Sequence, residues 1–505
     1  MRLTGADSSY RDAFRHHPIY GWTANPERPD VDRLNAQGFR FGELPRQKPP
    51  GVRRLLLLGD SFTFGSAYPR AATFPGLLEN WLNDAGERWE VIPLAAGGWG
   101  TGQQLLALRH AGLALDPDAV VLQLLPYNDL CNNSRPLAFG CDLQDYYRPY
   151  FVDREGDLEL TWFQPQRAAW RRRSALFRLV ERRRWLSLGP PESAPNLTPK
   201  EQRQWIRSIH RQYSLAAGLA YKPGLYSLTP GQDVPPAIRQ SWSISRRLVS
   251  EIAATLEARQ IPLLGMVVPF ADTFGPQWVR FHSEPGSWPR GAAGAAIRPG
   301  HGTATVEGWL KSRQVPVLSL RRKMLRSPIG AKDFFHPYGK ANDRHFNRLG
   351  HDQVAQWLLE AMADLGWTEA SAPDRWSRSH DLLGLPTAPV ATLGLTATPR
   401  KATSRSRLGR GQQTRLVFES PQAHDLELAF RFQTVQPMRR IEISINGQLR
   451  WRRRTGERQG TRLGDVIPFE VRPGLNQIVF RYRPGVGEGE PAVRFEALEL
   501  KAPSS

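Results

Sequence analysis

The strongest constraint on the fold is a series of apolar runs that alternate with helical patterns from Val52 onwards. These runs are continuously apolar, which is typical of parallel strands buried on both faces. Strands that alternate with helices predict a doubly wound α/β sheet, and such sheets bind ligands at the carboxyl ends of their strands. The candidate strands are Val52–Leu58, Glu90–Leu94, Ala119–Leu125, Leu263–Val268 and Val315–Leu320.

Two stretches carry the apolar spacing of amphipathic helices. Apolar residues recur every four positions over 244–256, before the fourth run, and follow the i, i+3, i+4 spacing over 354–362, after the fifth. We therefore expect helices to cover the sheet, and loops at the strand ends to carry the functional residues.

The pattern changes after about residue 364. Apolar and polar residues then alternate over 426–432, 441–445 and 478–482, as in antiparallel strands with one face in a core. Turn-forming Asn-Gly and Pro-Gly pairs lie at 446–447 and 473–474. This region predicts a separate antiparallel β-sandwich.

The sequence thus divides into an arm, an α/β domain, a linker and a sandwich. Two long insertions are expected to lie over the strand ends of the α/β domain. The predicted ranges are 1–50 for an irregular N-terminal arm, 51–365 for the α/β domain, 131–240 and 271–313 for its insertions, 366–413 for the linker and 414–505 for the sandwich.

The chain is strongly basic, with 68 Lys and Arg against 48 Asp and Glu and a net charge of +20. Such an excess favours anionic partners. Arginines spread over a solvated surface explain it better than a dedicated polyanion site, and no pattern of a nucleic-acid-binding module is present, so no nucleic-acid partner is expected.

Targeting and cysteine signals are sparse. No apolar run approaches the ~20 residues of a membrane span, and the first residues lack the apolar stretch of a signal peptide. The default expectation is a cytoplasmic protein, or an extracytoplasmic one if the N-terminus was trimmed. Cys131 and Cys141 can close one loop or stay free, and two cysteines are too few for a cysteine metal site. No cofactor is expected.

Four strand ends carry residues suited to acyl transfer, which needs a nucleophile, a base, an acid to orient it, and oxyanion donors. Ser61 follows the first run in "GDSF". The second run leads into "GGWG" and the third into "YND" with Asn128. His345 lies in the loop before the last helix, with Asp343 two residues earlier.

In this order, the four blocks resemble those of the SGNH (GDSL-like) hydrolases. The resemblance covers roughly 52–365 and implies a flavodoxin-like sheet. It implies that Ser61 is the nucleophile and His345 the base. The oxyanion hole would comprise the N–H of Ser61, the N–H of Gly98 and the side chain of Asn128.

The acid is less well defined by this resemblance. The commonest spacing in the family, Asp-x-x-His, would place the acid at Asn342. Asp343 gives Asp-x-His instead, which is also seen in related polysaccharide O-acetyltransferases, and Asp333 is the alternative. Asp60 is interpreted as a hydrogen-bonding residue of the turn, and His351 as a residue of a helix N-terminus.

We expect an acyl-enzyme on Ser61 and hydrolysis of acyl esters, with acetyl esters of carbohydrate as the favoured class. The alternatives are a polysaccharide O-acetyltransferase and a non-catalytic glycan-binding protein on the same scaffold. The sandwich resembles the carbohydrate-binding modules that accompany glycan esterases. Trp451 and Tyr482 on its strands are more typical of packing than of sugar stacking.

The first insertion holds eight arginines between Arg167 and Arg184. Its aromatic and basic residues do not separate onto two helical faces, which argues against a membrane-surface helix. We interpret it as a lid that turns arginines, including those at 171–173, towards the site and favours an acidic glycan ester. His336 has no default role.

Overall fold

The computed structural model describes most of the chain. The chain forms two compact units: Met1–Ser66 with Gly86–Arg322, and Ala67–Ala85 with Lys323–Ser505. The described residues are 13–45, 47–134, 148–154, 156–161, 236–269, 300–327, 329–335, 345–373, 380–383, 390–393, 395, 407–420, 422–456, 458–483 and 490–503.

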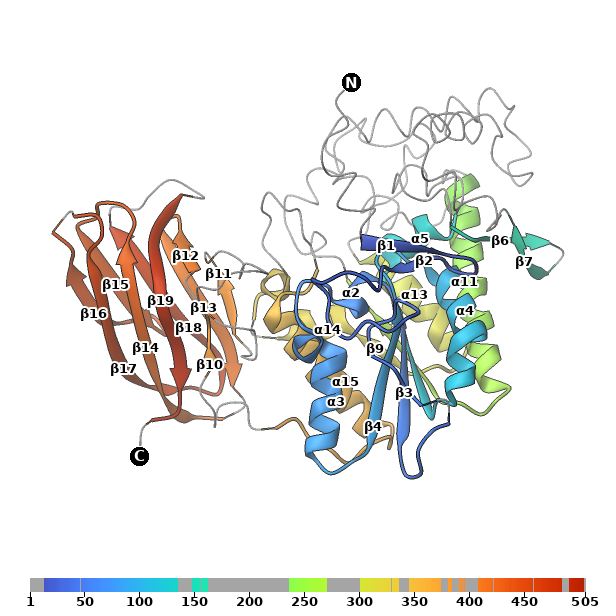
Figure 1. The fold of residues 1–505 in the computed structure, drawn as a ribbon. Coiled ribbons are helices and arrows are strands. Elements are labelled where there is room, and N and C mark those ends of the chain that lie inside the picture. Colours follow the sequence, from blue (N-terminus) through green and yellow to red (C-terminus); the bar gives the residue numbers. More distant parts are fainter. Residues whose placement is uncertain are drawn as a thin grey trace, which may run out of the picture. The chain divides into compact units, whose positions relative to one another are not determined.

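A five-stranded sheet forms the centre of the first unit (Figure 1). Its spatial order is β4-β3-β5-β8-β9, and every neighbouring pair is parallel. This is the flavodoxin-like order, in which strands are added on one side of the first strand and then on its other side, so that the strand order reverses between the first and third strands. The predicted fold class is confirmed. The strands are β3 (Arg53–Gly59), β4 (Trp89–Ala95), β5 (Ala119–Leu124), β8 (Leu263–Val267) and β9 (Val317–Ser319).

Three helices cover one face of this sheet. The helices α4 (Thr101–Ala107), α11 (Pro236–Glu257) and α13 (His301–Ser312) pack against one another or against the strands. The four-residue apolar spacing expected over 244–256 lies on α11, and its Ile244, Leu248, Ile252 and Leu256 are buried in the same core as the strands. Residues 301–312 were expected in an insertion, but they form the crossover helix between β8 and β9.

The first 365 residues contain further helices and strands. Between them they account for the strand-end loops and the last helix of the α/β pattern. They are α2 (Ser61–Phe64), η1 (Arg70–Ala72), α3 (Phe74–Asp84), the π-helical η2 (Leu108–Gly112), η3 (Leu113–Leu115), α5 (Pro126–Asn132), β6 (Tyr150–Arg154), β7 (Asp157–Thr161), α14 (Leu320–Arg326), η6 (Ala331–Phe334) and α15 (Arg348–Asp364).

The N-terminal arm is more regular than its sequence indicates. It contains an antiparallel hairpin of β1 (Phe14–His17) and β2 (Gly21–Ala24). Tyr20, Trp22 and Phe39 of the arm belong to the core of the parallel sheet. Aromatic burial therefore makes this segment part of the α/β core.

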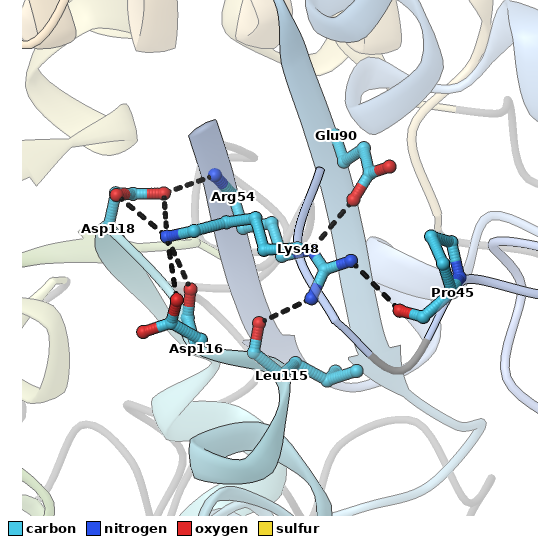
Figure 2. A network of polar contacts seen from close by, with 7 residues as sticks. All are labelled: Pro45, Lys48, Arg54, Glu90, Leu115, Asp116 and Asp118. Atoms are coloured by element: carbon cyan, nitrogen blue, oxygen red, sulfur yellow. Dashed lines mark hydrogen bonds and ion pairs between the residues drawn. The ribbon is translucent and has the colours of Figure 1, made fainter. Parts of the chain in front are cut away.

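The amino ends of the central strands are tied together by charge pairs (Figure 2). Arg54, which is 0% exposed, donates to Glu90 on β4 at 2.7 Å and to the carbonyl oxygen of Leu115 at 2.8 Å. Asp118 accepts the backbone N–H of Arg54 at 2.6 Å and the ammonium of Lys48 at 3.0 Å. The network joins β3, β4 and the residues before β5 to the arm.

The second unit ends in two antiparallel sheets (Figure 1). One has the order β10-β19-β14-β17, with β12 paired to β19, and the other has the order β11-β13-β18-β15-β16. The strands are β10 (His380–Asp381), β11 (Ala391–Leu393), β12 (Arg407–Arg410), β13 (Gln413–Ser420), β14 (His424–Thr434), β15 (Arg440–Ile445), β16 (Gln448–Arg454), β17 (Arg462–Val471), β18 (Gly474–Arg483) and β19 (Pro491–Lys501).

The two sheets share one apolar core, which confirms the predicted sandwich. Phe430 on β14 and Phe480 on β18 meet edge-to-face with ring centroids 5.7 Å apart. Trp451 and Tyr482 are only 7% and 1% exposed and belong to this core, so they offer no sugar-stacking platform. Three short strands, β10, β11 and β12, lie within the segment expected as a linker.

The β15–β16 turn follows the predicted chemistry. Asn446 and Gly447 have φ values of 49° and 84°, and positive φ at both central residues defines the type I′ hairpin turn. No described helix combines the length and apolarity that a membrane crossing requires.

Candidate active site

Ser61 is the first residue of α2, immediately beyond the carboxyl end of β3. Asp60 caps this short helix: its carboxylate accepts the backbone N–H of Phe62 at 2.9 Å. The second carboxylate oxygen of Asp60 accepts the side-chain amide of Asn128 at 3.2 Å. Asp60 is fully buried, and these bonds agree with the structural role expected for it.

Hydrogen bonds to Gln123 of β5 stabilise the turn that precedes Ser61. The Oε1 of Gln123 accepts the backbone N–H of Asp60 and the hydroxyl of Thr63, both at 3.0 Å. A Cβ at Gly59 would lie 2.2 Å from the Thr63 hydroxyl oxygen, so this close approach requires glycine. These contacts explain why glycine and aspartate precede the serine.

Helix α5 connects the turn at residues 59–61, the serine turn, to residues 97–100, the glycine block. Asn128 bonds to Asp60, and Asn132, one turn later, donates to the carbonyl oxygen of Gly98 at 3.1 Å. Residues four apart lie on the same face of a helix. One face of α5 therefore contacts both the turn before Ser61 and the glycine block, so it links the ends of β3, β4 and β5.

The glycine block has a defined backbone orientation. Gly98 has φ +76°, in the region that favours glycine. The carbonyl oxygen of Gly97 accepts the indole N–H of Trp22 at 2.9 Å. In a trans peptide the N–H points opposite to the C=O, so the N–H of Gly98 points away from that indole. The role of Gly98 as an oxyanion donor stays a prediction.

Two buried arginines brace these loops. Arg40 of the arm donates to the carbonyl oxygens of Phe64 and Gly65, at 2.9 Å and 2.6 Å, and so binds the end of the Ser61 helix. Arg148 donates to the Gly98 carbonyl oxygen at 2.8 Å, and its guanidinium lies 4.8 Å from the centre of a Trp22 ring. The strand-end loops are thus positioned by residues far away in sequence.

A second buried carboxyl group lies behind the serine turn. Asp129 accepts the backbone N–H of Leu125 at 2.7 Å, which closes the first turn of α5. Burial, reinforced by the nearby charge of Asp60, raises the pKa of Asp129 well above its usual range, although the hydrogen bond from the Leu125 N–H, and after it Thr101 and Arg148, act in the opposite direction. A raised pKa favours the neutral form, which lowers the cost of placing two acids beside one another.

His345 lies in the second unit, just before α15. The next residue, Phe346, forms an isolated antiparallel bridge with Phe335. Asn347 caps α15 by accepting the N–H of Gly350 at 2.9 Å. The loop at His345 is thus fixed within its own unit, while Ser61, Gly98 and Asn128 belong to the other. The pairing of Ser61 with His345 stays a prediction.

His351 has the structural role expected for it. It lies in the first turn of α15, is 1% exposed, and its Nδ1 accepts the backbone N–H of Phe74 at 3.2 Å. Asp343, His336, the arginine-rich segment at 162–185 and most of the two insertions lie outside the described residues. The backbone of Asp333 lies in η6, and the choice between Asp343 and Asp333 as the acid stays open.

Sequence reasoning missed the supporting residues Asn132, Arg40, Arg148 and Trp22. The four-residue spacing of Asn128 and Asn132 was a usable signal, because both can reach from one helical face. The others carry no local signal, since their contacts join distant parts of the chain. Among the described residues, no group of three or more His, Cys, Asp or Glu is placed to hold a metal ion. Cys131 is disulfide-bonded.

No family model and no curated protein matches this chain. Three solved structures illustrate what it resembles. A two-domain esterase active on acetylated mannans aligns over 90% of this chain and 91% of its own, with 10% identity and a TM-score of 0.29. A GDSL-like lipase from Bacteroides thetaiotaomicron covers 62% of this chain and 89% of its own, with 11% identity and a TM-score of 0.28.

The third is a family 35 carbohydrate-binding module from Clostridium thermocellum, which covers 23% of this chain and 93% of its own, with 14% identity and a TM-score of 0.17. These three neighbours are an esterase, a GDSL-like lipase and a carbohydrate-binding module. Because these TM-scores lie below 0.5, the fold assignment rests on the strand order of this chain.

Proposed function

We propose that this protein is a serine ester hydrolase of the SGNH type. The observation that carries the proposal is the bond between Asn128 and Asp60, because it joins a side-chain amide to the turn that presents Ser61. Both lie at the carboxyl ends of β3 and β5, where the strand order reverses and where α/β sheets of this kind bind ligands.

In the proposed reaction, the Oγ of Ser61 attacks the ester carbonyl carbon while His345 takes the hydroxyl proton. The N–H groups of Ser61 and Gly98 and the amide of Asn128 stabilise the oxyanion. His345 then returns the proton to the leaving alcohol, and an acyl-enzyme remains. Water, activated by the same histidine, releases the acid. Asp343 would orient the imidazole and stabilise its charged form.

The substrate class proposed is an acetyl ester on a glycan. The two-domain architecture supports it, since the mannan-active esterase and the carbohydrate-binding module describe the two halves of such a protein. The net charge of +20 favours an acidic glycan over a neutral one. We also propose an oxidising, extracytoplasmic location, because structural disulfides such as the one at Cys131 persist there.

The test is Ser61→Ala, with Ser66→Ala in the following loop as the matched control. Hydrolysis of a small activated acetyl ester and labelling by a fluorophosphonate probe should fall by several orders of magnitude in Ser61→Ala. Ser66→Ala should behave as the unmodified protein. A wild-type chain that neither hydrolyses nor labels would favour the non-catalytic glycan-binding alternative. Full labelling of Ser61→Ala would place the nucleophile elsewhere.

The spacing of Asp343 and His345 favours a second candidate, a polysaccharide O-acetyltransferase. The chemistry differs only in the acceptor, since a sugar hydroxyl replaces water at the acyl-enzyme. An assay with and without an oligosaccharide acceptor separates the two, because a transferase forms acetylated sugar in preference to free acetate.

A further inference from the structure

One outer face of the sandwich is covered with arginine. It is the solvent side of the sheet β11-β13-β18-β15-β16, where alternate residues point away from the core. On β15, Ile441, Ile443 and Ile445 point inward, so their neighbours point outward. We call this outer set the arginine face; its members are Arg440, Arg452, Arg454, Arg481 and Arg483, all exposed.

The strand register places these residues in two rows. Arg440 pairs with Arg454 on one side and with Arg483 on the other, so three guanidinium groups lie across neighbouring strands. Two residues along, Glu442 pairs with Arg452 and Arg481. Neighbouring strands lie about 4.8 Å apart and successive rows about 7 Å apart. The positive charges therefore form a regular array.

The array is only weakly neutralised. Glu442 accepts from Arg440 at 3.3 Å and from Arg452 at 3.0 Å. In the described part of the sandwich, no other carboxylate forms an ion pair with the arginine face. Like charges directly opposite each other on neighbouring strands are destabilising. The sheet thus carries a repulsion that an anionic ligand would relieve.

The outer face of the other sheet behaves differently. There Arg431 and Arg462 both pair with Glu496, at 3.3 Å and 3.4 Å, and Lys501 pairs with Glu427 at 3.3 Å. Charges of both signs are interspersed on that face, as on an ordinary solvated surface. The basic excess is therefore a property of one sheet and not of the sandwich as a whole.

We propose that the arginine face binds an extended polysaccharide that carries a carboxylate on successive sugars, a polyuronate. The guanidinium fork matches the two oxygens of a carboxylate, and its five donors permit bidentate bonding. A flat array of such forks fits a repeating anion better than it fits a single small ligand. The arginine face includes none of the proposed catalytic residues, and the inference does not depend on the proposed esterase activity.

Other polyanions fit the surface less well. Single-stranded nucleic acid is bound by exposed aromatic platforms as well as charge, and the exposed large apolar side chains of the described chain are four leucines and one valine. Membrane binding by a basic surface is strengthened by apolar anchors within it. The exposed Leu449 and Leu475 pair with Ser444 and Glu419, at the other end of the same strands.

The test uses the full chain and polygalacturonate as the probe, with a neutral mannan as the uncharged comparison. The variant is Arg440→Ser/Arg481→Ser/Arg483→Ser. Its matched control is Arg431→Ser/Arg462→Ser/Arg494→Ser, which removes the same charge from the other outer face. Loss of charge-assisted hydrogen bonds should raise the Kd for polygalacturonate about tenfold or more in the first variant, and hardly at all in the second.

Binding should weaken as salt rises and should be unchanged in Ser61→Ala, which separates this inference from the proposed catalysis. An equal loss of affinity in both triple variants would overturn the proposal, because net charge alone would then explain binding. Mannan binding as tight as polygalacturonate binding would also overturn it. Tighter binding of single-stranded DNA or of anionic vesicles, lost in the first variant only, would assign the face to that partner instead.

Discussion

The two ends of the parallel sheet use polar residues in different ways. At the amino ends, Arg54, Glu90, Lys48 and Asp118 satisfy one another as opposite charges (Figure 2). At the carboxyl ends, amides and backbone groups make many of the contacts: Asp60 accepts from Phe62 and Asn128, and the carbonyl oxygen of Gly98 accepts from Asn132.

The polar residues at the amino ends stabilise the fold, whereas those at the carboxyl ends surround the proposed nucleophile. The charged residues at the amino ends pair with one another and connect the strands to the arm. Amide and backbone donors at the carboxyl ends are positioned by second partners, and a developing oxyanion is the kind of charge that such preorganised donors stabilise. We therefore expect substitutions at the amino ends to change the free energy of unfolding, and substitutions at the carboxyl ends to change kcat.

The largest expected effect concerns the acid. If Asp343 orients His345, Asp343→Asn should lower kcat by about 10⁴-fold with little change in KM, as loss of the orienting carboxylate does in serine triads. Asp333→Asn is the control and should be nearly silent. Steady-state kinetics on a small acetyl ester distinguishes the two, and the reverse result would transfer the role to Asp333.

The next effect tests the amino ends. Arg54→Met removes a fully buried guanidinium and leaves Glu90 without its partner, which should cost about 3–5 kcal/mol of unfolding free energy. The adjacent Arg53→Met removes a guanidinium that lies over the Trp89 ring, and loss of this stacking should cost less, about 0.5–1 kcal/mol. Denaturant unfolding measures both, and kcat should be unchanged in the fraction that stays folded. If Arg54→Met kept its full stability and lost much of its kcat, the assignment of a purely structural role to the amino ends would be wrong.

The third prediction tests the carboxyl ends. Asn128→Ala removes one of the proposed oxyanion donors and should reduce kcat about 10²–10³-fold. The exposed Asn80→Ala on α3 serves as the control and should have wild-type kinetics. Because Asn128 also donates a hydrogen bond to Asp60, the thermal unfolding midpoint of Asn128→Ala must be measured as well. If the midpoint falls and kcat does not, Asn128 is a structural residue of the turn.

Local patterns in the sequence were sufficient for the main architecture. The continuous apolar runs predicted all five parallel strands, because a strand buried on both faces needs apolar residues at consecutive positions. Period-2 alternation predicted the sandwich for the converse reason, since its strands face water on one side. The turn at Asn446-Gly447 followed from the φ values that only such residues adopt readily.

The candidate site depended on both the local sequence and the tertiary structure. The sequence placed Ser61, Gly98 and Asn128 at strand ends, and the parallel register then brought those ends to one edge. What holds them there was decided by the tertiary structure: Arg40 reaches the carbonyl oxygens of Phe64 and Gly65 from the arm, and Arg148 reaches Gly98. Such contacts join residues far apart in the chain, so no local periodicity or spacing encodes them.

The same distinction applies to the arginine face. Alternation in the sequence determined that residues on either side of Ile441 and Tyr482 point to solvent. Only the pairing of β15 with β16 and β18 decided that Arg440, Arg454 and Arg483 share one row. A shift of one residue in register would turn a strand's outward residues into the core. The array is therefore a consequence of strand register, which is set by packing between distant strands.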